Sequence, residues 1–292
     1  MKSSLLFVFI ICVFQLRAQD LTIGLIADCQ YCNCDYSSRW NNDYRSALPR
    51  LQEAVDTLNE IKTDLTFHLG DFIDRDFKSF KLVLPVFNSL QMPHYHLLGN
   101  HDFSVDDSLK SQIAPILQLE QSYYAVSKGK WKFIVLDGTD ISMYKTANKD
   151  TLAQAEKIRQ HYLNEGRMQA MPWNGAIGNT QLAWLKNQLE SAQKEGLNTI
   201  VFCHFPILPT NEANLWNDKE VVEIIESYST VKAFINGHHH PGNYVYHHHV
   251  HYLTLQGMVR TKEANSFAYL TLFNHKIVVK GYGREPSRIL QF

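Results

Sequence analysis

Residues 65–75, with the sequence Leu-Thr-Phe-His-Leu-Gly-Asp-Phe-Ile-Asp-Arg, decide the fold class of this chain. Their first part predicts a short buried strand, which Gly70-Asp71 ends. Other strand patterns also run into polar residues. They end in Asp28-Cys29-Gln30, Gly99-Asn100-His101-Asp102, His204 and Gly237-His238-His239-His240. Ligands of open α/β sheets bind at the carboxyl ends of the strands, so we expect all these ends to bring side chains to one rim.

Helical and strand patterns alternate over most of the chain. Helical spacing of apolar residues is found in 43–61, and helices are also expected at 80–90, 181–193 and 218–228. Strand patterns lie at 21–27, 65–69, 95–98, 131–136, 199–203 and 231–235. Only strands follow Gly242, at 244–246, 250–255, 267–273 and 276–280, with a hairpin turn at Asn274-His275. This order predicts one α/β domain completed by antiparallel strands.

The segment 139–172 is the least regular part of the chain. It is long and partly helical, and Trp173-Asn174-Gly175 follows it. Long irregular segments in compact domains are often functional, so we expect an insertion near a binding site.

The N-terminus is typical of a secretory signal peptide. Lys2 precedes the uninterrupted apolar run 5–14, and a short polar stretch then ends in Ala18. This run is too short to span a bilayer. We therefore expect cleavage after Ala18 and an exported protein, periplasmic or extracellular, that consists of residues 19–292. The alternative is a buried N-terminal strand or helix.

Charge and hydropathy restrict the partners. Removal of Lys2 and Arg17 with the signal changes the formal net charge from −1 to −3. No basic face is indicated, so we expect no nucleic-acid partner. No later stretch has the length and apolarity of a membrane span. The oligomeric state cannot be read from the sequence.

Four cysteines remain after the signal: Cys29, Cys32, Cys34 and Cys203. A zinc knuckle would need a second ligand pair, which the first three cysteines lack. A local disulfide among them and free thiols both remain open, and export would permit the disulfide.

The polar residues at the strand ends have ordinary explanations when each is taken alone. An Asp there is usually a turn residue, and Gly70, Gly99 and Gly237 could simply end strands. Turn residues alone would not include imidazoles at matching positions, however. Carboxylate, amide oxygen and imidazole together suit manganese, iron or zinc. Two ions about 3.5–4 Å apart, bridged by one carboxylate, are the usual arrangement for displacement at phosphorus.

Taken in order, these segments resemble the signature of the calcineurin-like metallophosphoesterase superfamily, which reads D-x-H, GD-x-x-D, GNH-D/E, H and GH-x-H. The resemblance covers nearly all of residues 19–292 and implies a four-layer α/β/β/α sandwich with two divalent metal ions. One ion would be held by Asp28, Gln30, Asp71 and His240. The other would be held by Asp71, Asn100, His204 and His238, with Asp71 as the bridge.

The same resemblance implies a mechanism. A hydroxide between the ions would attack phosphorus in line. His101, oriented by Asp74, would donate a proton to the leaving oxygen, and Arg75 would approach a phosphate oxygen. Purple acid phosphatases match less well, because Asp74 stands where they need a Tyr.

Gln30 occupies a position where most of the superfamily has His. The manganese-dependent ADP-ribose/CDP-alcohol diphosphatase family has the same Asp-x-Gln and is also similar in the segments 26–31, 173–178, 215–217 and 250–257. Two residues depart from that family, Ala176 in place of a Gly and His239 in place of an Asp. This similarity implies manganese, with iron or zinc as alternatives, and a small nucleotide-linked diphosphate as substrate, with Asn174 in contact with it.

Three alternatives to this function remain. The first is a phosphomonoesterase or protein phosphatase at the same site. The second is a nuclease-type phosphodiesterase, which the lack of positive charge disfavours. The third is a non-catalytic exported binding protein with a degenerate metal site, although none of the proposed ligand positions holds an inert residue.

The histidines at 247, 248, 249 and 251 could form a metal-binding tract. Residues at strand spacing point to alternate faces, so we expect these side chains to lie apart on a surface strand rather than at one ion.

Overall fold

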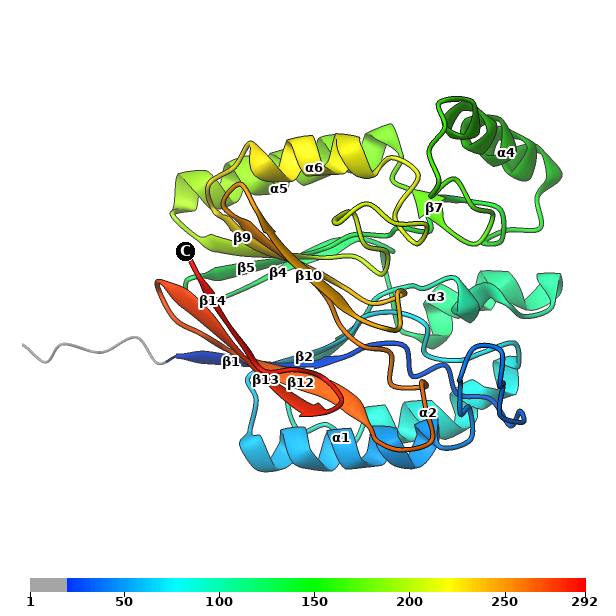
Figure 1. The fold of residues 1–292 in the computed structure, drawn as a ribbon, viewed down its shortest axis with the longest axis horizontal. Helices are drawn as coiled ribbons and strands as arrows, with labels where there is room; N and C mark the ends of the chain where they lie inside the picture. Colours follow the sequence, from blue (N-terminus) through cyan, green and yellow to red (C-terminus); the bar gives the residue numbers. More distant parts are fainter. Residues whose placement is uncertain (1–19) are drawn as a thin grey trace, which may run out of the picture.

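The computed structural model describes residues 20–292 (Figure 1). The predicted signal peptide therefore lies outside the described residues, and its cleavage stays a prediction. No helix among residues 20–292 is long and apolar enough to cross a membrane.

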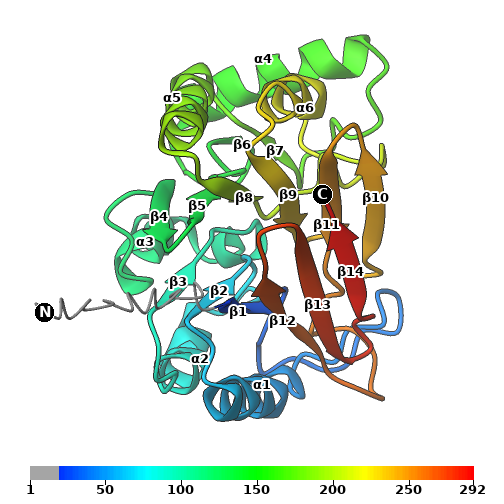
Figure 2. The ribbon, with the colours of Figure 1, turned by 90° about the vertical axis from the view of Figure 1, so that its left-hand side faces the viewer.

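Two six-stranded sheets form the centre of the molecule. The first has the order β14-β13-β12-β1-β2-β3, and the second β10-β11-β9-β8-β5-β4. Figures 1 and 2 show them face to face, with α1 and α2 outside the first sheet and α5 and α6 outside the second. The predicted four-layer α/β/β/α sandwich is thus confirmed.

The strands of the first sheet are β1 Leu21–Ile26, β2 Leu65–His68, β3 His94–His96, β12 Ser266–Leu272, β13 Lys276–Gly283 and β14 Arg288–Gln291. Those of the second are β4 Tyr124–Lys128, β5 Trp131–Val135, β8 Asn198–Phe202, β9 Val231–Asn236, β10 Asn243–His247 and β11 Val250–Thr254. A separate pair consists of β6 Ile141–Ser142 and β7 Gly175–Ala176. The α-helices are α1 Ala47–Ile61, α2 Phe80–Phe87, α3 Ile113–Ile116, α4 Lys149–Asn164, α5 Asn179–Glu195 and α6 Asp218–Glu226.

The main apolar core lies between the two sheets. Phe67 on β2 packs against Phe202 on β8 and Phe133 on β5, with ring centroids 4.6 and 5.5 Å apart. Fully burying one such side chain contributes about 1.5–3 kcal/mol relative to leaving it exposed. Contacts of this kind fix the two sheets against each other.

Parallel pairing brings the predicted ligand-bearing ends together. Strands β1, β2 and β3 are mutually parallel neighbours in the first sheet, and β8 and β9 are parallel neighbours in the second. Their carboxyl ends lie at the same edge of each sheet. Because the sheets are stacked, the rim expected from the sequence is shared between them.

Some elements differ from the sequence expectation. Strands β4 and β14 were not predicted; both lie at sheet edges and are only partly buried. The segment expected as an insertion contains β6 and the sixteen-residue helix α4, of which Ala155 alone is buried. Helix α4 lies at the margin of the second sheet (Figure 1).

A disulfide joins Cys32 to Cys34, and Cys29 and Cys203 are free and buried.

Candidate metal centre

Side chains from both sheets converge at the shared rim. Asp71 follows β2, whereas His204 follows β8 and His238 follows β9. One ligand atom from each of these side chains lies within 4.8 Å of the others. A carboxylate and two imidazoles at this separation can hold a divalent ion.

The backbone at this rim takes the left-handed conformation. The φ angles are 52° at Asp28, 44° at Gln30, 57° at Asp71 and 64° at His238. Positive φ is uncommon for residues with a side chain, and such residues gather at functional sites, where the surrounding structure enforces them. The backbone conformation of these loops thus directs the four side chains toward the rim.

Two glycines make room for the cluster. A side chain at Gly99 would place its Cβ 2.2 Å from Asp71 Oδ1. One at Gly70 would lie 2.6 Å from His204 Nδ1, and Gly70 itself has φ 94°. These glycines therefore allow a close approach of ligand residues, beyond ending strands.

Asp71 lies at the centre of the cluster and contacts several of its members. Its Oδ1 accepts the His101 backbone N–H at 2.7 Å, and its Oδ2 accepts Gln30 Nε2–H at 2.9 Å and lies 3.3 Å from His204 Nε2. Burial would raise the pKa of Asp71, but the neighbouring His204 and His101 charges outweigh it and hold that pKa below its ordinary value. Asp71 is therefore ionised and faces residues of both expected ligand sets.

Hydrogen bonds orient two imidazoles with one nitrogen toward the rim. His204 Nδ1 is 2.8 Å from the Leu69 carbonyl, so Nδ1 carries the proton and Nε2, 3.2 Å from Asn100 Oδ1, is left to ligate. His238 Nε2 is 2.8 Å from Asn174 Oδ1, which leaves Nδ1 of His238 for an ion. Partners of this kind fix the tautomer of metal-ligating histidines.

Asn174 is completely buried. Besides accepting from His238, it donates through Nδ2 to the carbonyls of Gln169 and Glu212, at 2.9 and 2.7 Å. Both ends of its amide are thus engaged with protein groups. This geometry favours a role in positioning His238 over the substrate contact that the sequence suggested.

Gln30 contacts the same carboxylate through its amide nitrogen. Its Nε2 donates to Asp71, while its Oε1 accepts from Asn42 Nδ2 at 3.4 Å. Asn42 Oδ1 is buried without a partner. The oxygen and nitrogen of a side-chain amide have nearly the same shape, so either amide can be turned by 180° in the same space. Turning both would direct Gln30 Oε1 toward the cluster and let Gln30 Nε2 donate to Asn42 Oδ1.

Asp28 and His240, two members of the first expected ligand set, lie beside each other. Asp28 is fully buried, accepts the His238 backbone N–H at 3.0 Å and lies 3.7 Å from His240 Nε2. Burial raises the pKa of Asp28 to about 7, helped by the Asp71 charge and opposed by the His204 charge. Burial also lowers the pKa of His240 to about 3. A buried carboxylate that resists ionisation beside a neutral imidazole is an arrangement that a cation would stabilise.

His101, Asp74 and Arg75 form a chain at the mouth of the cluster. His101 Nδ1 is 3.1 Å from Asp74 Oδ1, and Arg75 donates to Asp74 Oδ2 at 3.1 Å. About a third of the His101 side chain and 57% of the Arg75 side chain are exposed. Burial lowers the pKa of His101, but the Asp71 and Asp74 charges outweigh it and raise that pKa to about 9. The protonated ring is therefore available to a substrate from solution.

Asp102 has a role that sequence reasoning did not assign. Its fully buried carboxylate accepts the backbone N–H groups of Asp71, Phe72, Ile73 and Gly99, at 2.8–3.3 Å. It therefore joins the loop after β2 to the loop after β3. The signal was the Gly99-Asn100-His101-Asp102 motif itself, but only the fold shows which backbone groups the carboxylate reaches.

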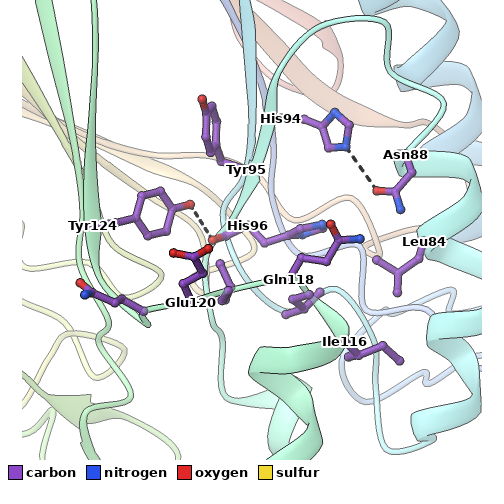
Figure 3. A pocket seen from close by; sticks show the side chains of 12 residues that line it. Leu84, Asn88, His94, Tyr95, His96, Ile116, Gln118, Glu120 and Tyr124 are labelled. Carbon is purple, nitrogen blue, oxygen red and sulfur yellow. Dashed lines mark hydrogen bonds between the residues drawn. The ribbon is translucent and has the colours of Figure 1, made fainter.

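A cavity of about 490 Å³ lies elsewhere, between α2, the segment 116–121, β3 and β4 (Figure 3). In it Tyr124 donates a hydrogen bond to the His96 carbonyl at 2.9 Å. None of the lining residues belongs to the cluster at the rim. The cluster and this cavity are therefore separate features.

Comparison with known proteins gives a consistent result. The model of the family described as calcineurin-like phosphoesterase matches residues 21–242. Similar curated proteins include the manganese-dependent ADP-ribose/CDP-alcohol diphosphatases of Arabidopsis thaliana, 28% identical over 93% of this chain and 97% of that protein, and of Mus musculus, 29% identical over 93% of both. A dimetal phosphatase from Danio rerio has a similar fold, with a TM-score of 0.83, 23% identity and coverage of 93% of this chain and 99% of that one.

Proposed function

The chain belongs to the calcineurin-like phosphoesterase family and is a metal-dependent phosphoester hydrolase, and from this premise we propose that it hydrolyses the diphosphate bond of nucleotide-linked small molecules such as ADP-ribose and CDP-alcohols. The observation that carries the proposal is the convergence of Asp71, His204 and His238 on one point, with Asp28, Gln30 and His240 around it. The names of the relatives from Arabidopsis thaliana and Mus musculus support the substrate class and manganese.

The donor set fits two divalent ions. The first set is Asp28, Gln30, Asp71 and His240, and the second is Asp71, Asn100, His204 and His238. Oxygen donors dominate the first set, which suits manganese, whereas the two imidazoles of the second also suit iron or zinc. When bound, such ions polarise phosphoryl oxygens and lower the pKa of water.

The other residues at the mouth act on the substrate. The raised pKa of His101 keeps the ring protonated at neutral pH, so it can donate a proton to the departing oxygen. Asp74 orients the ring through Nδ1, which leaves Nε2 to face the substrate. Arg75 is held by Asp74 and by the Tyr44 hydroxyl at 3.1 Å, and its exposed guanidinium can pair with a phosphate oxygen.

A turnover screen tests the substrate class. Purified protein with manganese would be offered ADP-ribose, a CDP-alcohol, an alkyl phosphate monoester and a phosphodiester. We expect the highest kcat/KM on the diphosphates. Preference for the monoester would support the phosphomonoesterase alternative, and no turnover of any compound would support the non-catalytic one.

The leaving group allows a second test with His101→Ala. Diphosphate cleavage expels a phosphate monoester with a second pKa of about 6, whereas an alkyl monoester expels a far more basic alkoxide. General acid catalysis contributes about 10²–10⁴-fold only where the leaving group needs protonation. We therefore expect a smaller loss on ADP-ribose than on the alkyl monoester. Equal losses would mean that His101 mainly orients phosphate.

We also propose that the protein is exported after cleavage at Ala18. The Cys32–Cys34 disulfide supports an oxidising compartment. Mass spectrometry of the protein isolated from its natural host would give the N-terminal residue. A protein that retains residues 1–18 in the cytoplasm would overturn this proposal.

A further inference from the structure

A second group of metal-binding side chains lies at the turn between β10 and β11. It consists of Glu226, the last residue of α6, with His247 and His248, and their ligand atoms lie within 4.8 Å of one another. The turn is close to α6 (Figure 2). The pairing His251↔Ala233 places it near the amino end of β9, whereas His238 and His240 follow the carboxyl end of that strand. The group is thus remote from the candidate metal centre.

The turn geometry brings the two histidines together. β10 pairs with β11 as far as His247↔Val250, so His248 and His249 form the turn itself. His248 has a φ of 40°, which departs from the strand conformation. The rings of His247 and His248 stack with centroids 4.4 Å apart and planes 12° apart. The expectation that these histidines point to alternate faces is therefore wrong for this pair, because His248 lies outside the strand.

Both imidazoles face one carboxylate. His247 Nδ1 is 2.6 Å from Glu226 Oε1, and His248 Nδ1 is 3.0 Å from Oε2. The hydroxyl of buried Tyr252 donates to Oε1 at 2.9 Å and fixes the carboxylate from the protein side. The Glu226 side chain is 11% exposed, whereas the imidazoles are 48% and 67% exposed. The carboxylate is therefore held in place by the protein interior, whereas the two imidazoles are accessible to an ion from solution.

We propose that Glu226, His247 and His248 bind a divalent transition-metal ion of the zinc class, with water completing the coordination. Zinc takes imidazole nitrogen and carboxylate oxygen at about 2.0–2.2 Å, which separates tetrahedral ligand atoms by about 3.3 Å. The distance to Glu226 would widen by about 0.3 Å at His248 and by about 0.7 Å at His247, and the two stacked rings would turn so that one ion lies in the plane of each. Imidazole ligands favour zinc, copper or nickel over magnesium, calcium or manganese. The bound ion ties α6 to the β10–β11 hairpin.

The adjacent His249 offers a matched control. It lies in the same turn, but its Nε2 is 3.2 Å from the Tyr228 carbonyl and it is outside the group. His248→Gln and His249→Gln each remove one turn histidine and leave the candidate metal centre unchanged. Both variants, Glu226→Gln and the unmodified protein would be equilibrated with zinc, passed through a desalting column and analysed for metal content. Zinc that enters the candidate metal centre adds equally to the zinc content of all four proteins. Differences in zinc content between them therefore report on the group at the β10–β11 turn.

We expect the unmodified protein and His249→Gln to retain one more zinc per chain than His248→Gln or Glu226→Gln, with equal manganese-dependent turnover in all. Tyr252→Phe should bind this zinc about 10–100-fold more weakly, as loss of an outer hydrogen bond does at other metal sites. Equal zinc content in the unmodified protein and His248→Gln would overturn the proposal and leave the group as two histidine–carboxylate contacts. An equal loss in His249→Gln would also overturn it, because binding would then follow the number of histidines and not their geometry.

Discussion

Asn174→Ala separates positioning of a metal ligand from contact with substrate. The substitution removes three hydrogen bonds of the buried Asn174 amide, to His238 at 2.8 Å and to the Gln169 and Glu212 carbonyls at 2.9 and 2.7 Å. The bond to Gln169 is fully buried, and the other two are partly buried. A buried group left without a partner costs about 1–3 kcal/mol, so we expect the Gln169 carbonyl alone to lower the free energy of unfolding by about that amount. Loss of the bond to His238 also frees its ring to rotate.

The effect on metal binding can be estimated in the same way. Removing an outer hydrogen-bond partner of a ligating histidine costs about 10–100-fold in metal affinity, which corresponds to about 1.4–2.8 kcal/mol. Calorimetry with manganese would measure this affinity, and urea unfolding the stability. Steady-state kinetics with ADP-ribose at saturating manganese would give KM. Asn164→Ala, at the exposed end of α4, is the matched control.

Two results would refute the reasoning. Unchanged manganese affinity together with a raised KM would return Asn174 to the role of a substrate contact. Unchanged stability would show that the three hydrogen bonds are replaced, for example by water in the space of the lost amide. The expected result is weaker manganese binding with little change in KM once metal is saturating.

Three further substitutions test the centre. Asp71→Ala should remove nearly all activity and lower the metal content below two ions per chain, and elemental analysis that still finds two ions with full turnover would contradict the bridging role. Gln30→His should shift the metal preference from manganese toward zinc or iron, because imidazole is a softer ligand than an amide oxygen; the ranking of metals by turnover checks this. The pKa of His101, raised to about 9, predicts that general acid activity is present below that pH and is lost as pH rises through it. Asp74→Asn removes one of the charges that raise this pKa, so the alkaline limb of kcat/KM on an alkyl phosphate monoester, whose leaving group needs the proton, should move to lower pH; an unmoved limb on that substrate would contradict the assignment.

Much of the fold could be predicted because its central strands are buried on both faces. Strands such as Leu65–His68 and Val231–Asn236 are buried at nearly every position, and Gly70-Asp71 and Asn236-Gly237 mark where these patterns end. Strands β4 and β14 lie at sheet edges and mix buried and exposed positions, so they lack that signal. The segment that contains helix α4 was expected to be partly helical, but the helix has a single buried residue, Ala155, so burial does not mark its bounds.

The candidate centre was predictable where its residues stand directly at strand ends. The placement of Asp71, His204 and His238 at one rim follows from parallel pairing within each sheet together with the stacking of the two sheets, and these three residues belong to one expected ligand set. The position of Asn174 could not be deduced, because the orientation of its amide depends on the carbonyls of Gln169 and Glu212 and on the His238 ring. The pairing of His247 with His248 likewise depends on one turn dihedral, which no periodicity reports.

The left-handed backbone at the rim has a consequence for directed evolution. A residue with a side chain costs about 1–2 kcal/mol in this conformation, and glycine avoids that cost. Gln30 is the least suited of the four left-handed rim residues, since Asp and His adopt positive φ more readily than Gln does. Gln30→Gly would relieve this strain, but it would also remove the buried hydrogen bonds of Gln30 with Asp71 and Asn42, and each buried group left unpaired costs about 1–3 kcal/mol. A library selected for thermal tolerance without a catalytic screen should therefore retain Gln30, so that selection for stability alone does not remove this residue of the candidate metal centre.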